Sequence, residues 1–289
     1  MSSWAEVFRE TGFHLLRRAS VRLPSDVKKR LRKAYGEETS PTGKTQLKNI
    51  LDNIEAAERL GRPICQDTGL ISFYVKTRKP SLLPELRRAL EKASAEATAQ
   101  LPLRPNAVHP LTRKNSGNNL GKRIPHIEWV FNDSDWVELT VVLKGAGSEN
   151  MSAFAVLSPS EGEKGVEKFV VNRVVEAGGR PCPPTVLCVG IGGTGDLAFK
   201  LAKLALLRPL GSRNPDEAVS KLENRLVKLA NRTGIGPMGL GGKFTVLDAK
   251  VEHAHCHTAN LPVALNFQCW ADRRATARIH SDRSVEILE

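Results

Sequence analysis

Apolar side chains recur every three or four residues in several stretches of the chain, a spacing that places them on one face of a helix. Ser25 suits the N-cap of the second such stretch, and Gly61 suits the residue just past the end of the third. The predicted helices cover residues 5–18, 26–35, 45–60, 81–100, 165–177, 197–205 and 216–231. We expect an auxiliary helical segment over 1–40 and one domain over 41–289.

Short apolar or alternating runs between these helices predict strands. They cover residues 70–76, 127–131, 136–143, 185–189, 244–251 and 262–269. The second and third flank the polar residues 132–135, as in a β-hairpin. The run over 262–269 is expected to be the last core strand. The pattern therefore predicts an α/β fold, with mixed β-sheets flanked by helices and functional loops between the elements.

Residues 180–205 combine a buried strand, a glycine-rich turn and the start of a helix. Backbone amides at such a junction carry partial positive charge and suit an anionic ligand or cluster. Cys182 precedes the strand within Pro-Cys-Pro. We therefore expect this segment to contribute half of an active site.

Three interpretations of that segment stay open. Gly190, Gly192 and Gly195 spell G-x-G-x-x-G, the dinucleotide fingerprint, but no Asp or Glu follows about twenty residues later to hold a ribose. The glycines can also form a tight turn that binds nothing. In the third interpretation, Cys182 joins two distant cysteines as a ligand of a metal cluster.

The composition is that of a soluble globular protein, with 40% hydrophobic residues in 289. No run approaches the roughly eighteen apolar residues of a membrane span, and the acidic N-terminal residues do not resemble a signal peptide. We expect a cytoplasmic protein that is not bound to a membrane.

Lys and Arg number 43 against 31 Asp and Glu, which gives a net charge of +12. Nucleic acid, an acidic substrate or an acidic partner chain would each fit such an excess. No zinc-finger spacing or RNP-like strand supports nucleic acid. A carboxylate substrate fits the charge equally well.

Five cysteines, an odd number, argue against a disulfide framework in a cytoplasmic protein. They are Cys65, Cys182, Cys188, Cys256 and Cys269, too dispersed for a local zinc knuckle. By composition the best zinc-like cluster is His253, His255, Cys256 and His257. Alternation along an extended strand would put the three histidines on one face, although histidines that are merely hydrogen-bonded at a strand end are equally expected.

Two loops carry further chemistry. Cys65, Gln66 and Asp67 precede a strand, where a thiol, an amide and a carboxylate can serve metal and proton chemistry. Alternatively Asp67 is a cap and the thiol is buried. Arg104 could clamp a carboxylate with its planar fork, although a generic surface arginine is the more common case.

Four segments, together and in this order, resemble the α-subunit of class I fumarate hydratases and L(+)-tartrate dehydratases. They are Cys-Gln-Asp-Thr-Gly at 65–69, Lys-Gly-Ala-Gly-Ser-Glu-Asn at 144–150, Gly-Ile-Gly-Gly-Thr at 190–194 and Cys-Trp-Ala-Asp-Arg-Arg at 269–274. The likeness covers roughly residues 40–280. In this family three cysteines hold a [4Fe-4S] cluster, and the resemblance implies Cys65, Cys182 and Cys269. The iron without a protein ligand would act as a Lewis acid.

The resemblance also implies a set of site residues. Gln66, Asp67 and Arg104 would contact the substrate through side chains, and Gly147 through its backbone. Asp67 and His257 would be catalytic, with His255 as the alternative if the register is shifted by the neighbouring Cys256.

In single-chain members of the family, a C-terminal domain supplies a threonine base, further arginines and a lysine. The sequence stops at Glu289, so the resemblance implies a separate β-subunit and a hetero-oligomer. The expected reaction is hydration of fumarate to L-malate, with dehydration of L(+)-tartrate as the alternative. A non-catalytic iron-sulfur subunit and an NAD-binding protein are weaker alternatives.

Overall fold

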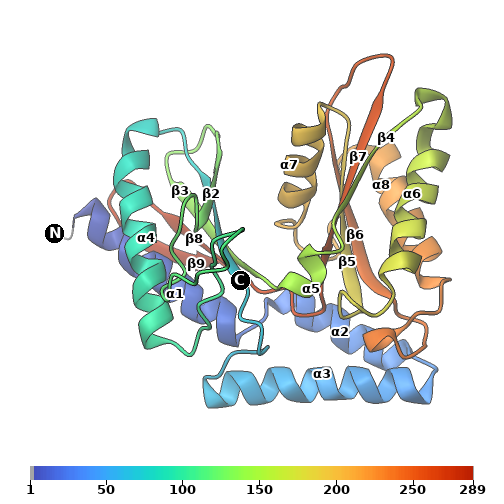
Figure 1. Ribbon diagram of the computed structural model, residues 1–289, viewed down its shortest axis with the longest axis horizontal. Helices are drawn as coiled ribbons and strands as arrows, with labels where there is room; N and C mark the ends of the chain where they lie inside the picture. Colours follow the sequence, from blue (N-terminus) through green and yellow to red (C-terminus); the bar gives the residue numbers. More distant parts are fainter. Residues whose placement is uncertain (1–2, 289) are drawn as a thin grey trace. The chain divides into compact units, whose positions relative to one another are not determined.

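The chain divides into two compact units in the computed structural model, which describes residues 3–288 (Figure 1). The first unit contains described residues up to Pro24, residues 53–146 and those from Asp272 onward; the second contains residues 25–52 and 147–271. The predicted segment 1–40 is thus shared between the units. None of the helices formed by residues 3–288 has the length and apolar character needed to cross a membrane.

The first unit is a five-stranded sheet covered by two helices. The strand order is β2-β1-β3-β8-β9, with bounds β1 Leu70–Lys76, β2 His126–Val130, β3 Val137–Lys144, β8 Arg274–Ile279 and β9 Val285–Leu288. Helix α1 (Trp4–Val21) and helix α4 (Leu83–Gln100), which follows a short 3-10 turn η1 (Pro80–Leu82), pack against it. Buried Phe8, Leu15 and Leu90 join Phe73 and Val141 of the sheet in one core.

Two sequence-based predictions fail in this sheet. The strands β2 and β3 exist, but they do not form a hairpin, because β1 lies between them and pairs with both. The run over 262–269 is not the last core strand, because β8 and β9 follow it along the chain and complete the sheet of the first unit. In both cases the pairing partner is distant in sequence, where local patterns carry no information.

The second unit is built on a four-stranded sheet of order β4-β7-β5-β6. The strands are β4 Ala153–Leu157, β5 Thr185–Ile191, β6 Val246–His253 and β7 Leu261–Gln268. The helices are α2 Ser25–Glu37, α5 Ala146–Glu149, α6 Gly162–Ala177, α7 Gly195–Ala205 and α8 Glu217–Asn231, with the 3-10 turns η2 Pro159–Glu161 and η3 Pro237–Gly239. Helix α3 (Pro41–Leu60) contributes its residues up to Asp52 to this unit and the rest to the first.

Helices cover both faces of this second sheet. Helix α7 lies on one face, and α6 and α8 lie on the other (Figure 1). Val170, Leu226 and Leu265 belong to the larger core on the α6 and α8 side, while Ala198 and Ala264 form a smaller one under α7. The mixed sheets flanked by helices and the helical N-terminal segment confirm the predicted fold class.

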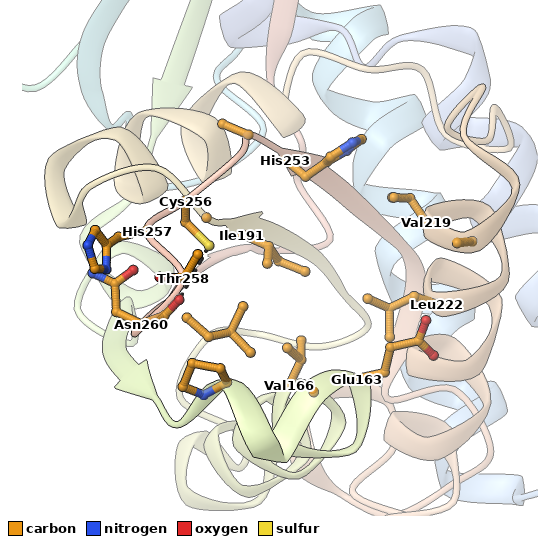
Figure 2. A pocket seen from close by; sticks show the side chains of 16 residues that line it. Glu163, Val166, Ile191, Val219, Leu222, His253, Cys256, His257, Thr258 and Asn260 are labelled. Atoms are coloured by element: carbon orange, nitrogen blue, oxygen red, sulfur yellow. Dashed lines mark hydrogen bonds between the residues drawn. The ribbon is translucent and has the colours of Figure 1, made fainter.

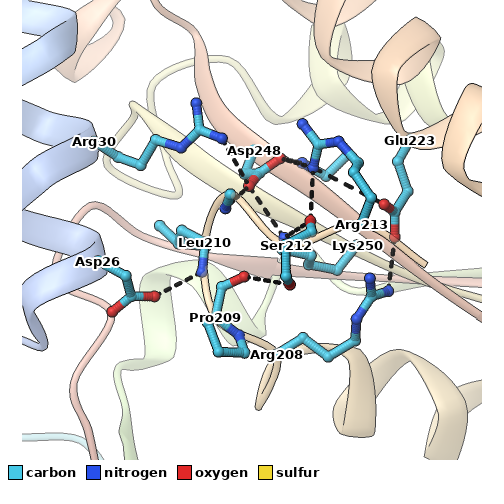
Figure 3. Close-up of polar contacts among 12 residues, drawn as sticks. Asp26, Arg30, Arg208, Pro209, Leu210, Ser212, Arg213, Glu223, Asp248 and Lys250 are labelled. Carbon is cyan, nitrogen blue, oxygen red and sulfur yellow. Dashed lines mark hydrogen bonds and ion pairs between the residues drawn. The ribbon is translucent and has the colours of Figure 1, made fainter. Parts of the chain in front are cut away.

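A cluster of buried charged side chains lies at β6, the edge strand of this sheet (Figure 3). Asp248 and Lys250 are both 0% exposed and lie 3.2 Å apart, and Arg213 donates to Asp248 at 2.7 Å. Burial alone would raise the pKa of Asp248, but the Lys250 ammonium, the Gly211 N–H and Arg213 hold that pKa below its ordinary value. Burial lowers the pKa of Lys250, and the Asp248 carboxylate opposes that shift.

Candidate active site

The loop that carries the first candidate cysteine lies between α3 and β1 in the first unit. Cys65 is half-buried, and the neighbouring Gln66 is exposed. The loop enters β1 through Gly69, whose φ is +84°. A Cβ at Gly69 would lie 2.7 Å from the backbone nitrogen of Lys144. Only glycine fits this position, so close packing against the end of β3 fixes the path of the loop.

Asp67 is the hydrogen-bonding centre of this loop. Its Oδ1 accepts from the Gly69 N–H at 2.9 Å and its Oδ2 from the Ala146 N–H at 2.8 Å. Its carbonyl oxygen accepts from Nη1 of Arg273 at 2.7 Å. The capping role considered for Asp67 is therefore present in the fold. A catalytic role for its carboxylate stays a prediction.

Arg104 is joined to the same loop through its backbone. Its N–H donates to Oγ1 of Thr68 at 2.9 Å. Its exposed guanidinium forms no ion pair with any of the residues 3–288. The side chain is therefore available to an anionic ligand, as its predicted carboxylate-binding role requires.

Sequence reasoning misses two asparagines that hold Arg104 in place. Asn119 is 1% exposed, and its Nδ2 donates to the Arg104 carbonyl oxygen at 3.0 Å. Asn106 donates from Nδ2 to the Gly69 carbonyl oxygen at 3.0 Å, and its backbone N–H donates to Oδ1 of Asn119 at 2.7 Å. The concentration of asparagine within 106–119 is the signal in the sequence that could have identified them.

Cys182 and Cys269 lie at one end of the four-stranded sheet in the second unit. Cys182 precedes β5 and Cys269 follows β7, and the Trp270 N–H donates to the Cys182 carbonyl oxygen at 3.3 Å. Both cysteines are half-buried. Gly147 lies beside them, because a Cβ there would be 3.1 Å from the carbonyl oxygen of Arg180. The second unit thus brings together two candidate ligands and the glycine predicted to contact substrate.

His257 lies at the opposite end of that sheet. Strands β5 and β6 are parallel, with Ile191 beside His253, so His257 follows their carboxyl ends whereas Cys182 precedes the amino end of β5. Strand β5 has seven residues, which at about 3.3 Å each separates its ends by about 20 Å. A small dicarboxylate does not span that length. Residues 180–205 therefore do not form parts of one site, because Cys182 and the glycine turn lie at opposite ends of β5.

A cavity of about 440 Å³ opens at the carboxyl ends of β5 and β6 (Figure 2). Its walls are mainly apolar, with Val166, Ile191 and Leu222 among the lining residues, and His257 lies at its margin. Nδ1 of His257 accepts from the Ala259 N–H at 3.1 Å, so a neutral ring carries its proton on Nε2. The apolar walls make the cavity itself a poor site for a dicarboxylate.

The predicted alternation of the histidines is wrong. Strand β6 ends at His253, and beyond it Cys256 and His257 line the cavity while His255 does not. Over the described part of the chain, no three side chains of His, Cys, Asp or Glu come together as a metal site. The histidine-rich segment therefore does not form the zinc-like cluster that its composition suggested.

The glycine turn after β5 does not form a dinucleotide cradle. A Cβ at Gly190 would lie 1.9 Å from the Ala198 carbonyl oxygen in α7, and one at Gly192 would lie 2.0 Å from the Ala254 carbonyl oxygen. The backbone N–H groups of Gly192 and Gly193 donate to the carbonyl oxygens of Pro262 and His255 at 2.8 and 3.2 Å, so the turn does not offer them to a phosphate. These glycines allow close packing, which removes the physical basis for the NAD-binding alternative.

The three candidate cysteines suit an iron-sulfur cluster in donor chemistry. All three lie on loops, as predicted, and all three are half-buried. Thiolates are the usual protein ligands of such clusters. Cys65 belongs to the first unit, and Cys182 and Cys269 lie on hydrogen-bonded loops of the second.

The fumarate hydratase (fumerase) family matches residues 10–278. A Methanocaldococcus jannaschii chain, provisionally named L(+)-tartrate dehydratase subunit alpha, is 47% identical over 276 residues, covering 94% of this chain and 97% of the relative. The L(+)-tartrate dehydratase subunits alpha of Escherichia coli K12 and Shigella sonnei are each 41% identical over 272 residues, covering 93% of this chain and 89% of the relative.

These matches extend over nearly the whole chain and include all four segments that carried the resemblance. The relatives are named as subunits, which implies a partner chain for proteins of this kind. With the fold, the loops and the matches in agreement, the chain belongs to the fumarate hydratase family of hydro-lyases.

Proposed function

We propose that the chain is the α-subunit of a two-subunit hydro-lyase that dehydrates L(+)-tartrate. The observation that carries this proposal is its 41–47% identity, over more than nine-tenths of its length, to chains with that name. The motifs led us to expect fumarate first, whereas the names of these relatives favour the tartrate alternative. Fumarate hydration stays the second candidate, because the matching family is named for it.

We further propose that Cys65, Cys182 and Cys269 bind a [4Fe-4S] cluster. Their thiol chemistry, their loop positions and the hydrogen bond between the Cys182 and Trp270 segments support this assignment. When bound, a cluster with three protein ligands supplies a Lewis-acidic iron that activates the substrate hydroxyl as a leaving group. The thiols suit a reducing compartment, so the proposal places the enzyme in the cytoplasm.

The chain's own residues bind and orient the substrate. The guanidinium of Arg104 pairs with one carboxylate, and the exposed amide of Gln66 can donate to a substrate oxygen. Asp67 holds the loop through its bonds to Gly69 and Ala146, so that Gln66 is presented in one orientation. The proton-abstracting base would come from the β-subunit.

His257 lies too far from Cys182 to share a site with it in the same chain. Because it lies about 20 Å from Cys182 along β5, it would act on substrate only at the site of another chain. His257→Ala should then lower activity in the assembled enzyme, and an equal mixture of His257→Ala and Cys182→Ser chains should regain part of it.

The substrate is tested with the full chain purified together with a candidate β-subunit. Formation of oxaloacetate from L(+)-tartrate and of L-malate from fumarate would be measured under anaerobic conditions. The proposal expects the higher kcat/KM with tartrate. A higher value with fumarate would replace the first candidate with the second, and turnover by the α-chain alone would refute the division into subunits.

The ligand assignment is tested by iron content after anaerobic reconstitution. Cys65→Ser, Cys182→Ser and Cys269→Ser should each lose the visible absorption of the cluster. Cys256→Ser is the matched control and should retain it, because this exposed residue lies near His257 at the far end of the sheet. Loss of the cluster in Cys256→Ser and retention in Cys269→Ser would overturn the assignment.

A further inference from the structure

Arg273 has the largest fully buried side chain of the described residues, with 1% of its surface exposed. It stands between the Cys-Trp-Ala segment and β8, and its carbonyl oxygen accepts from the Leu143 N–H at 3.0 Å. That backbone bond places Arg273 beside the end of β3. The resemblance to the family, as used above, gives this arginine no role.

The guanidinium of Arg273 makes one hydrogen bond, and that bond goes to the Cys-Gln-Asp loop. Nη1 donates to the Asp67 carbonyl oxygen at 2.7 Å. The Asp67 carboxylate in turn accepts from the N–H groups of Gly69 and Ala146. Arg273 and Asp67 therefore connect β8, the end of β3 and the loop of Cys65 in one chain of hydrogen bonds.

Gly145 packs closely against this contact. A Cβ at Gly145 would lie 2.9 Å from Oδ2 of Asp67 and 3.5 Å from Nη2 of Arg273. Glycine at this position thus lets the carboxylate and the guanidinium approach the same point. A methyl group there would push the Asp67 carboxylate away, while its distance to the guanidinium would be an ordinary contact.

Stability alone does not explain a buried guanidinium here. Arg273 forms no ion pair within residues 3–288, and its buried Nε has no hydrogen-bond partner among them. Burying a charge without a carboxylate partner is unfavourable, and an apolar side chain of similar length would fill the same space. What the guanidinium adds is a rigid donor fork, aimed at the carbonyl group two residues after Cys65.

We propose that Arg273 is a positioning residue that holds the 65–69 loop in the geometry that the active site requires. This inference rests on the proposed function only where it gives the loop a role in binding the cluster and substrate. The positioning itself belongs to the metal-free chain. It can therefore be measured without a cluster, substrate or partner.

The experiment measures hydrogen exchange of the Gly69 and Ala146 amides in the metal-free full-length chain, together with iron uptake on reconstitution. Arg273→Gln should speed exchange at both amides by about tenfold or more, since a charge-assisted hydrogen bond of ordinary strength is lost. Arg273→Lys keeps the charge and a donor, and should restore part of the protection. Gly145→Ala leaves both charged groups in place and should expose the same two amides.

Arg278→Gln is the matched control, because Arg278 lies near the other end of β8, at 3.6 Å from Glu138. It should leave the exchange of Gly69 and Ala146 unchanged. The inference would be overturned if Arg273→Gln or Gly145→Ala had the melting temperature of the wild type and also left the exchange of both amides unchanged. If Arg273→Gln does not fold, Arg273→Lys and Gly145→Ala decide by the same measurement.

Iron uptake separates this inference from the proposed function. If the wild-type chain takes up iron and Arg273→Gln takes up less, the proposed cluster and the positioning role both stand. If the wild type takes up no iron but exchange still rises in Arg273→Gln, the proposed cluster fails while the positioning role stands. Normal exchange in Arg273→Gln with normal iron uptake would refute the positioning role alone.

Discussion

Glu38 offers a sharp test of how the second unit is held together. The side chain is 4% exposed, and its two oxygens accept from the backbone N–H groups of Thr39, Ser40, Lys243 and Phe244 at 2.9–3.2 Å. One carboxylate thus joins the turn between α2 and α3 to the start of the β6 segment. We expect Glu38→Gln to weaken this junction at neutral pH.

The magnitude follows from counting donors. A glutamine has one acceptor oxygen, and its amide NH2 would face N–H groups that the carboxylate now satisfies. About two of the four donors lose their acceptor, at about 1–3 kcal/mol for each buried group. We therefore expect the free energy of unfolding to fall by about 2–6 kcal/mol. Urea denaturation followed by far-UV circular dichroism would measure it.

The effect should also depend on pH in a defined direction. Burial alone would raise the pKa of Glu38, but the N–H groups of Lys243, Ser40, Phe244 and Thr39 hold that pKa below its ordinary value of 4.5. A carboxyl whose pKa is depressed by folding contributes stability above its unfolded pKa and loses it as pH falls through the folded value. The difference between wild type and Glu38→Gln should be constant above about pH 5.5 and shrink well below pH 4.5.

Glu37→Gln is the control, because the neighbouring Glu37 is exposed and its contact with Lys33 is a surface ion pair at 3.8 Å. We expect a change of less than about 0.5 kcal/mol there. Equal stabilities of Glu38→Gln and Glu37→Gln at pH 7 would refute the reasoning. So would a difference that persists undiminished in acid.

Three further predictions concern other parts of the chain. Gly190→Ala should destabilise by at least about 3 kcal/mol or prevent folding, because the added methyl would meet the backbone of α7. Gly36→Ala, in α2 with nothing within 4 Å, is its control in the same urea titration and should leave the stability unchanged or raise it by up to about 1 kcal/mol, because alanine favours a helix more than glycine does. Lys250→Met should lower the free energy of unfolding by about 3 kcal/mol, since it leaves Asp248 buried with one fewer cation; an unchanged urea midpoint would contradict this. Arg104→Ala in the assembled enzyme should reduce kcat/KM by a factor corresponding to about 2–5 kcal/mol; normal steady-state kinetics would show that its guanidinium binds no substrate carboxylate.

Local patterns predicted individual elements well and their pairing poorly. The run 70–76 matched β1 in full, because its β-branched and aromatic residues are bounded by turn residues. The run 185–189 matched most of β5 for the same reason. The hairpin predicted over 127–143 is wrong because β1 lies between β2 and β3 in the sheet. No local feature of the turn encodes that arrangement. Strand β8 was missed because Arg274 and Arg278 interrupt its apolar residues.

The candidate site shows the same limit. Motifs identified the loops of Cys65, Cys182 and Cys269, because their residue types carry recognisable chemistry. The placement of His257 could not be predicted, because sequence spacing does not say at which end of a sheet a segment lies. Arg273 lies within a motif, but no sequence pattern assigns it a role, because its guanidinium acts through a hydrogen bond to a residue 206 positions earlier.

The interleaving of the two units has a consequence for synthesis on the ribosome. The second unit possesses all of its chain once Ala271 has been added. The first unit, although it contains the N-terminal helix, still lacks two of its five strands at that moment. The buried face of β3, with Leu139 and Val141 at 0% exposure in the finished fold, has no β8 beside it until residues 274–279 emerge. The N-terminal part of the nascent chain therefore cannot close until its C-terminal strands are available, and the unpaired edge of β3 is open to aggregation until then.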